Sequence, residues 1–89
     1  MTPTRSPAVD LVNRVLQAVL GDEADLTAET PLFEVPGFDS LALAAVVEGL
    51  EAELERPLPD ELITPESFET PARIAEVLVA PALREGAAP

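Results

Sequence analysis

Ten prolines divide this chain into segments and limit where long helices can form, because proline inside a helix removes a backbone hydrogen bond and clashes with the preceding turn. Two long stretches contain no proline, residues 8–30 and 37–56. In the first, apolar residues recur at three- and four-residue intervals, which predicts an amphipathic helix over residues 7–20. Ser6 is expected to be its N-cap and Gly21 its C-terminal stop. The apolar residues at this spacing are Val9, Val12, Val15, Leu16, Val19 and Leu20.

The second proline-free stretch predicts a second long helix. Asp39 is a good N-cap, because its carboxylate accepts from free N–H groups and its charge suits the positive end of a helix. Pro57 and Pro59 end the helix. Gly49 lowers helix propensity by about 1 kcal/mol relative to alanine, which indicates that another segment approaches closely there. The buried face is expected to consist of Leu43, Val46, Val47, Leu50 and Leu54.

The connection between the two helices, residues 22–38, is unusually long for a small domain. A short turn is expected to start at Thr30 within it, and Gly37 permits a change of direction before the second helix. We expect the apolar residues of this loop to attach it to the core, and these are Leu26, Leu32, Phe33 and Val35.

Two threonines that each precede a proline mark further helix starts. Thr64 predicts a short helix that carries Phe68, and Thr70 predicts a last helix that Pro81 stops. The buried stripe of the last helix is expected to be Ile74, Val77 and Leu78.

These elements predict an all-α protein, a small four-helix bundle of three longer helices and one short helix, with a long loop between helices one and two. The folded domain is expected over residues 6–80, with a flexible N-terminus at 1–5 and a flexible tail at 81–89.

Composition excludes several classes of function. The formal net charge of −12 makes binding to nucleic acid or to anionic membranes unfavourable and favours basic protein partners. Cysteine and histidine are absent, so disulfides and thiolate metal sites are excluded, and we expect no bound metal ion. No apolar run approaches the roughly 18 residues of a membrane span. A cytoplasmic monomer is the resulting expectation.

Ser40 lies at the expected start of the second helix, where free N–H groups and the helix dipole favour an anion. A phosphate ester on its hydroxyl would suit this place. The same hydroxyl has no visible activation as a nucleophile, because the chain has neither histidine nor lysine. We therefore expect no catalytic residue. From these residues alone, an ordinary capping or surface serine stays open.

The stretch Gly37-Phe38-Asp39-Ser40-Leu41 resembles the G-x-D-S-L attachment motif of acyl and peptidyl carrier proteins, and the resemblance extends over residues 6–80. It implies that Ser40 carries 4′-phosphopantetheine, attached by a phosphopantetheinyl transferase that uses coenzyme A. It also implies that Asp39 is needed for recognition by the transferase and its metal ion. The chain itself would be a carrier, not an enzyme, and its cargo would ride as a thioester.

By the same resemblance the second helix contacts the partner enzymes. Fatty-acid-synthesis carriers usually have acidic residues just after the serine, where this chain has Ala42 and Ala45, so we expect dedicated partners. The segment before the last helix, with Phe68-Glu69-Thr70-Pro71, is similar to D-alanyl and other aminoacyl carriers. The residues expected to contact partners are Leu41, Ala44, Ala45, Glu48, Glu51 and Ala52.

Three hypotheses for the function follow. The first is a discrete carrier of a small acyl or aminoacyl group in a polyketide or related antibiotic pathway. An acyltransferase or an amino-acid-activating ligase would load it, and a ketosynthase or another synthase would use the cargo. The second is a fatty acid carrier or a carrier domain excised from a larger synthase. The third is an acidic protein-interaction module without a prosthetic group.

Overall fold

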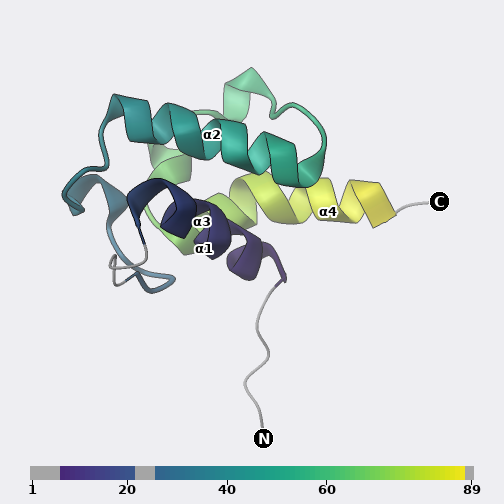
Figure 1. Ribbon diagram of the computed structural model, residues 1–89. Coiled ribbons are helices and arrows are strands. Elements are labelled where there is room, and N and C mark those ends of the chain that lie inside the picture. Colours follow the sequence, from purple (N-terminus) through teal and green to yellow (C-terminus); the bar gives the residue numbers. More distant parts are fainter. Residues whose placement is uncertain (1–6, 22–25, 88–89) are drawn as a thin grey trace, which may run out of the picture.

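The computed structural model describes residues 7–21 and 26–87, and all the regular structure in these ranges is helical (Figure 1). The expected all-α bundle is confirmed. The elements in chain order are α1 (Pro7–Leu20), the 3₁₀ turn η1 (Leu32–Glu34), α2 (Ser40–Leu54), the 3₁₀ turns η2 (Asp60–Leu62) and η3 (Pro65–Phe68), α3 (Pro71–Ile74), the π-helical turn η4 (Ala75–Val79) and α4 (Ala80–Ala87). Ser6 and the expected flexible segment 1–5 lie outside the described residues.

The predicted ends of the two long helices are confirmed. Gly21 follows α1 with φ +98°, a conformation that suits glycine, and its N–H donates to the Gln17 carbonyl over 2.8 Å. At the start of α2, the Asp39 carboxylate accepts from the Ala42 N–H at 2.9 Å. The last turn of α2 closes on Glu55, which has a left-handed backbone.

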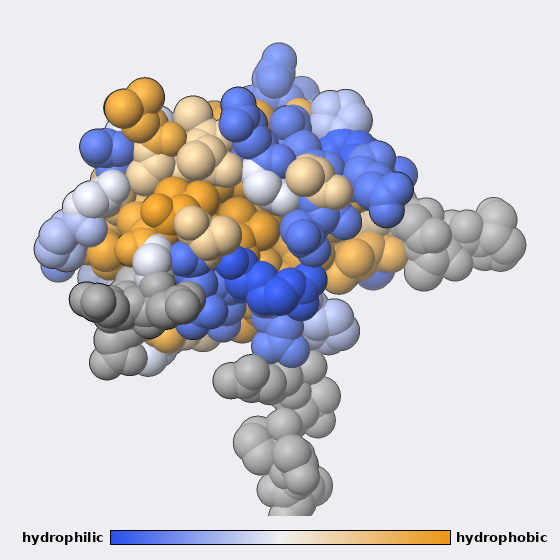
Figure 2. All heavy atoms as spheres, in the orientation of Figure 1, coloured by the Kyte–Doolittle hydropathy of each residue, from blue (hydrophilic) through white to orange (hydrophobic). Residues whose placement is uncertain are grey.

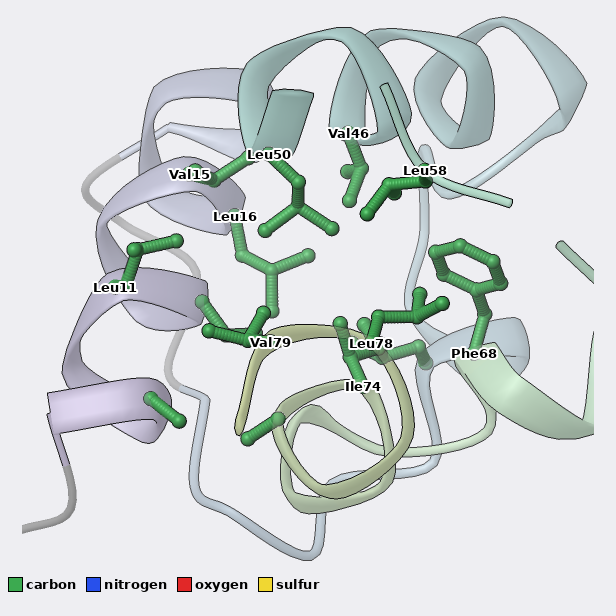
Figure 3. Close-up of a cluster of buried hydrophobic side chains, with 14 of the residues drawn as sticks. Leu11, Val15, Leu16, Val46, Leu50, Leu58, Phe68, Ile74, Leu78 and Val79 are labelled. Atoms are coloured by element: carbon green, nitrogen blue, oxygen red, sulfur yellow. The ribbon is translucent and has the colours of Figure 1, made fainter. Parts of the chain in front are cut away.

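One hydrophobic core joins α1, α2 and the C-terminal helical run (Figure 3). Val12, Val46 and Leu50 have no exposed surface, as the helical spacing predicts. The neighbouring Val47 and Leu54, also expected on this face, are only partly buried. The core residues that Figure 3 labels are Leu11, Val15, Leu16, Val46, Leu50, Leu58, Phe68, Ile74, Leu78 and Val79.

The loop between α1 and α2 is tied to the segment before α3. The Leu32 N–H donates to the Glu69 carbonyl over 2.8 Å, and the Ala72 N–H donates to the Ala28 carbonyl over 2.9 Å. Leu32 is fully buried, and these contacts fix the loop that leads into α2.

The burial expected for Phe33 is wrong, because its side chain is 50 % exposed. Its ring packs edge-on against Phe38, with 5.5 Å between the ring centroids. Phe38 is buried and is the phenylalanine of this loop that packs into the hydrophobic core. Leu26 and Val35 are partly buried against the core, as expected.

Both Thr-Pro starts are confirmed. The Thr64 hydroxyl accepts from the Ser67 N–H at 3.3 Å, and the Thr70 hydroxyl accepts from the Arg73 N–H at 3.1 Å. Phe68, at the end of η3, is completely buried. The short helix predicted to start at Thr64 is therefore the 3₁₀ turn η3.

The last helix does not stop at Pro81, contrary to the prediction, and continues to Ala87. A wide turn precedes the proline: the Ala80 N–H donates to the Ala75 carbonyl, five residues back. The π-helical geometry changes the hydrogen-bond register before Pro81, so that its ring and its missing N–H fit within the helix. The same turn brings Ala75 and Val79 into the core beside Ile74 and Leu78 and leaves Val77 half-buried.

Candidate functional site

Ser40 is exposed as the first residue of α2. The backbone turns at Gly37, whose φ of +90° lies in the region that favours glycine, and then runs extended through Asp39. This change of direction separates the buried Phe38 from the exposed serine two residues later. The loop contacts described above therefore present the Ser40 hydroxyl to solvent at the end of a 15-residue helix.

The start of α2 is suited to a negatively charged substituent. The first N–H groups of a helix have no partner within it, and the aligned peptide dipoles place partial positive charge there. Asp39 satisfies one of these groups with its carboxylate, and its carbonyl accepts from the Leu43 N–H at 2.9 Å. Both contacts set the direction of the first turn and with it the place of Ser40. A phosphate ester on the Ser40 oxygen fits this end of the helix.

Ser67 is the only other serine in the described residues, and its burial and hydrogen bonding differ from those of Ser40. Its side chain is buried, and its hydroxyl lies 3.1 Å from the Thr64 hydroxyl within the cap of η3. A bulky substituent on Ser67 would break this cap and displace the core residue Phe68. Ser67 therefore serves the fold.

The residues predicted to contact partners are not all equally available. Leu41 is 82 % exposed, Ala44, Glu48 and Ala52 are exposed, and Ala45 is half-buried. We name these five residues the α2 outer face.

Glu51 and Ala42 differ from the α2 outer face. The Glu51 carboxylate accepts from the Leu58 N–H at 2.9 Å and holds the turn that follows α2. Ala42, which the sequence placed near the attachment point, is buried and lies under this face. The structural role of Glu51 could not be predicted from the sequence, because no local pattern reveals a partner seven residues away.

Three further observations concern the rest of the described residues. An apolar cavity of about 330 Å³ is lined by Leu58, Leu62 and Val77, at the end of α2 opposite to Ser40. It is not part of the attachment site. In the described residues no group of three or more His, Cys, Asp or Glu side chains is placed to hold a metal ion. Nor is any helix described here long and apolar enough to cross a membrane.

In the described residues of this small all-α protein, Ser40 is an exposed serine at the start of a long helix, which is suited to covalent modification by another enzyme. The family model described as "Phosphopantetheine attachment site" matches residues 10–78, and the chain belongs to this family. The protein therefore carries 4′-phosphopantetheine covalently on a serine and tethers substrates for other enzymes. Carrier proteins of this family generally interact with a phosphopantetheinyl transferase and with synthase enzymes. Searches of curated proteins and of solved structures gave no match.

Proposed function

We propose that Ser40 is the attachment serine of a discrete carrier protein that delivers a small acyl or aminoacyl group between enzymes of a natural-product pathway. One observation supports the assignment of Ser40 as the attachment site. The family match covers two serines, and of these Ser40 is exposed whereas Ser67 is buried in a cap. A transferase can reach the first hydroxyl without disturbing the fold.

Ser40, the start of α2 and Asp39 have separate roles in the attachment reaction. In the transfer, the Ser40 oxygen forms a bond to the phosphorus next to pantetheine, the bond from that phosphorus to the nucleotide part of coenzyme A breaks, and a base of the transferase takes the hydroxyl proton. The positive end of α2 then stabilises the resulting phosphodiester. Asp39 holds the first turn and adds the carboxylate that we assign to recognition by the transferase.

When bound, the group supplies the thiol that a chain without cysteine lacks, and the cargo is held on it as a thioester. A tether also raises the effective concentration of the cargo at each partner's active site. The chain contributes the anchor and the surface that partners meet. It needs no base of its own, because the partners supply the chemistry.

The α2 outer face favours dedicated partners. Near Ser40 it is apolar, with Leu41 and Ala44 exposed, and its acidic residue Glu48 lies two turns further along the helix. A partner that matches it has small apolar contacts near the arm and basic side chains further away. We assign loading to an acyltransferase or an amino-acid-activating ligase, and use of the cargo to a ketosynthase or another synthase.

Intact-mass measurement tests the attachment site. The unmodified protein is incubated with coenzyme A and a phosphopantetheinyl transferase of broad specificity. The wild type should gain the mass of one phosphopantetheine group, and Ser40→Ala should gain none. Thr27→Ala, an exposed hydroxyl in the loop, is the control and should be modified like the wild type. A mass gain on Ser40→Ala would overturn the assignment.

Loading assays test the pathway. The modified protein is offered to a malonyl transferase of fatty acid synthesis and to a panel of amino-acid-activating ligases and small-acyl transferases. We expect poor loading by the malonyl transferase and efficient loading by one member of the panel. Efficient malonyl loading and no loading by the panel would favour a fatty acid carrier instead.

A further inference from the structure

A shallow apolar groove of about 370 Å³ runs between α1 and α2 on the surface. Figure 2 shows apolar residues continuing from α2 onto α1 on this side of the molecule, bordered by hydrophilic ones. Arg14 and Glu53 close one end of the groove with an ion pair at 3.0 Å. We call this surface the α1–α2 groove, and its apolar walls consist of Val15, Ala18, Val19, Ala45, Gly49 and Ala52.

The groove exists because the two helices meet closely at Gly49. A Cβ atom at this position would lie 2.8 Å from Cγ1 of Val15, so only glycine permits the approach. On either side of the contact the walls are alanines, which are too short to fill the space. Ala18 and Ala52 are exposed, and Ala45 is half-buried. These alanines leave apolar surface between the two helices in contact with water, and an apolar side chain of another protein would remove that surface from water on binding.

The α1–α2 groove is continuous with the α2 outer face. Ala45 and Ala52 belong to both, and at a rise of 1.5 Å per residue they lie about 7.5 Å and about 18 Å along the helix from Ser40. A standard interface buries about 800 Å² on each partner, which corresponds to a patch with a radius of about 16 Å. A partner centred on the Ser40 hydroxyl therefore covers at least the Ala45 end of the groove.

The negative charge of this chain determines which kind of partner can bind in the α1–α2 groove. A second copy of this chain is unfavourable, because each copy has a formal net charge of −12. Glu48 is exposed beside the groove on the α2 outer face. An apolar side chain with a basic residue close to it matches both the groove and this carboxylate.

We propose that the α1–α2 groove receives an apolar side chain of the phosphopantetheinyl transferase, with a basic residue of the transferase meeting Glu48. The transferase is the partner that has to reach the Ser40 hydroxyl itself, so its surface must lie over the start of α2. Helix α1 then forms the second wall of the docking site through Ala18 and Val19. This inference rests on the proposed attachment at Ser40.

Steady-state kinetics of a phosphopantetheinyl transferase of broad specificity test the inference, with the full-length unmodified protein as the varied substrate. Ala18→Arg fills the groove and adds one positive charge. Gln17→Arg is the matched control, because it adds the same side chain at the adjacent exposed position, which faces a polar hollow beside Asp10 and Asn13 instead. Circular dichroism establishes that both variants are folded.

Ala18→Arg should lower kcat/KM about tenfold, the effect of losing one buried apolar contact, mainly through a higher KM. Gln17→Arg should change it by less than about twofold. If both variants changed kcat/KM equally, or if neither changed it, docking of the transferase in the α1–α2 groove would be refuted, although Ser40 would still be modified. A dimer of the wild type that Ala18→Arg dissociates would show that the groove holds a second copy and would overturn it as well. Failure of the wild type to be modified would instead refute the proposed function.

Discussion

Replacement of Gly49 by alanine tests the closest contact between α1 and α2. In an exposed helix interior this change raises the free energy of unfolding by about 1 kcal/mol, because alanine has the higher helix propensity. Here the added Cβ would lie 2.8 Å from Cγ1 of Val15. Val15 is buried and branched at Cβ, so its methyl group cannot easily turn away. Overpacking of this kind costs about 1–3 kcal/mol.

The net expectation for Gly49→Ala is a loss of about 0–2 kcal/mol instead of a gain. The double-mutant cycle with Val15→Ala isolates the contact. Val15→Ala alone should cost about 2 kcal/mol through lost burial and the cavity it leaves. In its background the methyl group is gone, and Gly49→Ala should now stabilise by the full helix-propensity gain of about 1 kcal/mol.

Urea unfolding followed by far-UV circular dichroism measures these values, since the chain has no tryptophan or tyrosine for fluorescence. A steric contact between positions 15 and 49 should give a coupling free energy of about 1–3 kcal/mol. Stabilisation by Gly49→Ala of the same size in both backgrounds would refute it. The two helices would then not touch at Gly49, and the α1–α2 groove would lack the contact between Gly49 and Val15 that forms part of its walls.

Substitutions of Asp39, Glu51 and Leu50 have distinct expected costs in the same unfolding assay. Asp39→Ala removes the N-cap of α2 and should cost about 1 kcal/mol, whereas Asp39→Asn should keep most of it; equal losses would contradict capping. Glu51→Ala leaves the buried Leu58 with an unpaired N–H and should cost about 1–3 kcal/mol, against less than about 1 kcal/mol for Arg14→Ala in its exposed ion pair. The reverse order would refute the structural role of Glu51. Leu50→Ala should cost about 2–5 kcal/mol, because Leu50 is fully buried, and a cost below 1 kcal/mol would contradict its burial.

Features that depend on neighbouring residues could be predicted from the sequence. The caps at Asp39, Thr64 and Thr70 each join a side chain to an N–H three residues on, so the local pattern contains both partners. The α1 helix from Pro7 to Leu20 follows from the spacing of its apolar residues in the same way. The glycine at position 49 also signalled the close contact, although not which residue makes it.

Features that depend on tertiary packing could not be predicted. Pro81 lies inside a helix because a π-helical turn precedes it, and nothing local in the sequence distinguishes this from a stop. The loop contains two phenylalanines five positions apart, and only the packed core determines that Phe38 is buried and Phe33 exposed. Glu51 has the spacing of a surface residue, but its carboxylate holds the Leu58 N–H.

Site mapping on the unmutated protein tests the central claim most directly. After modification with coenzyme A, cleavage after glutamate places the two serines of the family match in separate peptides, residues 35–48 with Ser40 and residues 67–69 with Ser67. Mass spectrometry should find the phosphopantetheine on the first peptide, at the serine that opens α2. Its presence on the second, or an unchanged first peptide, would contradict the account.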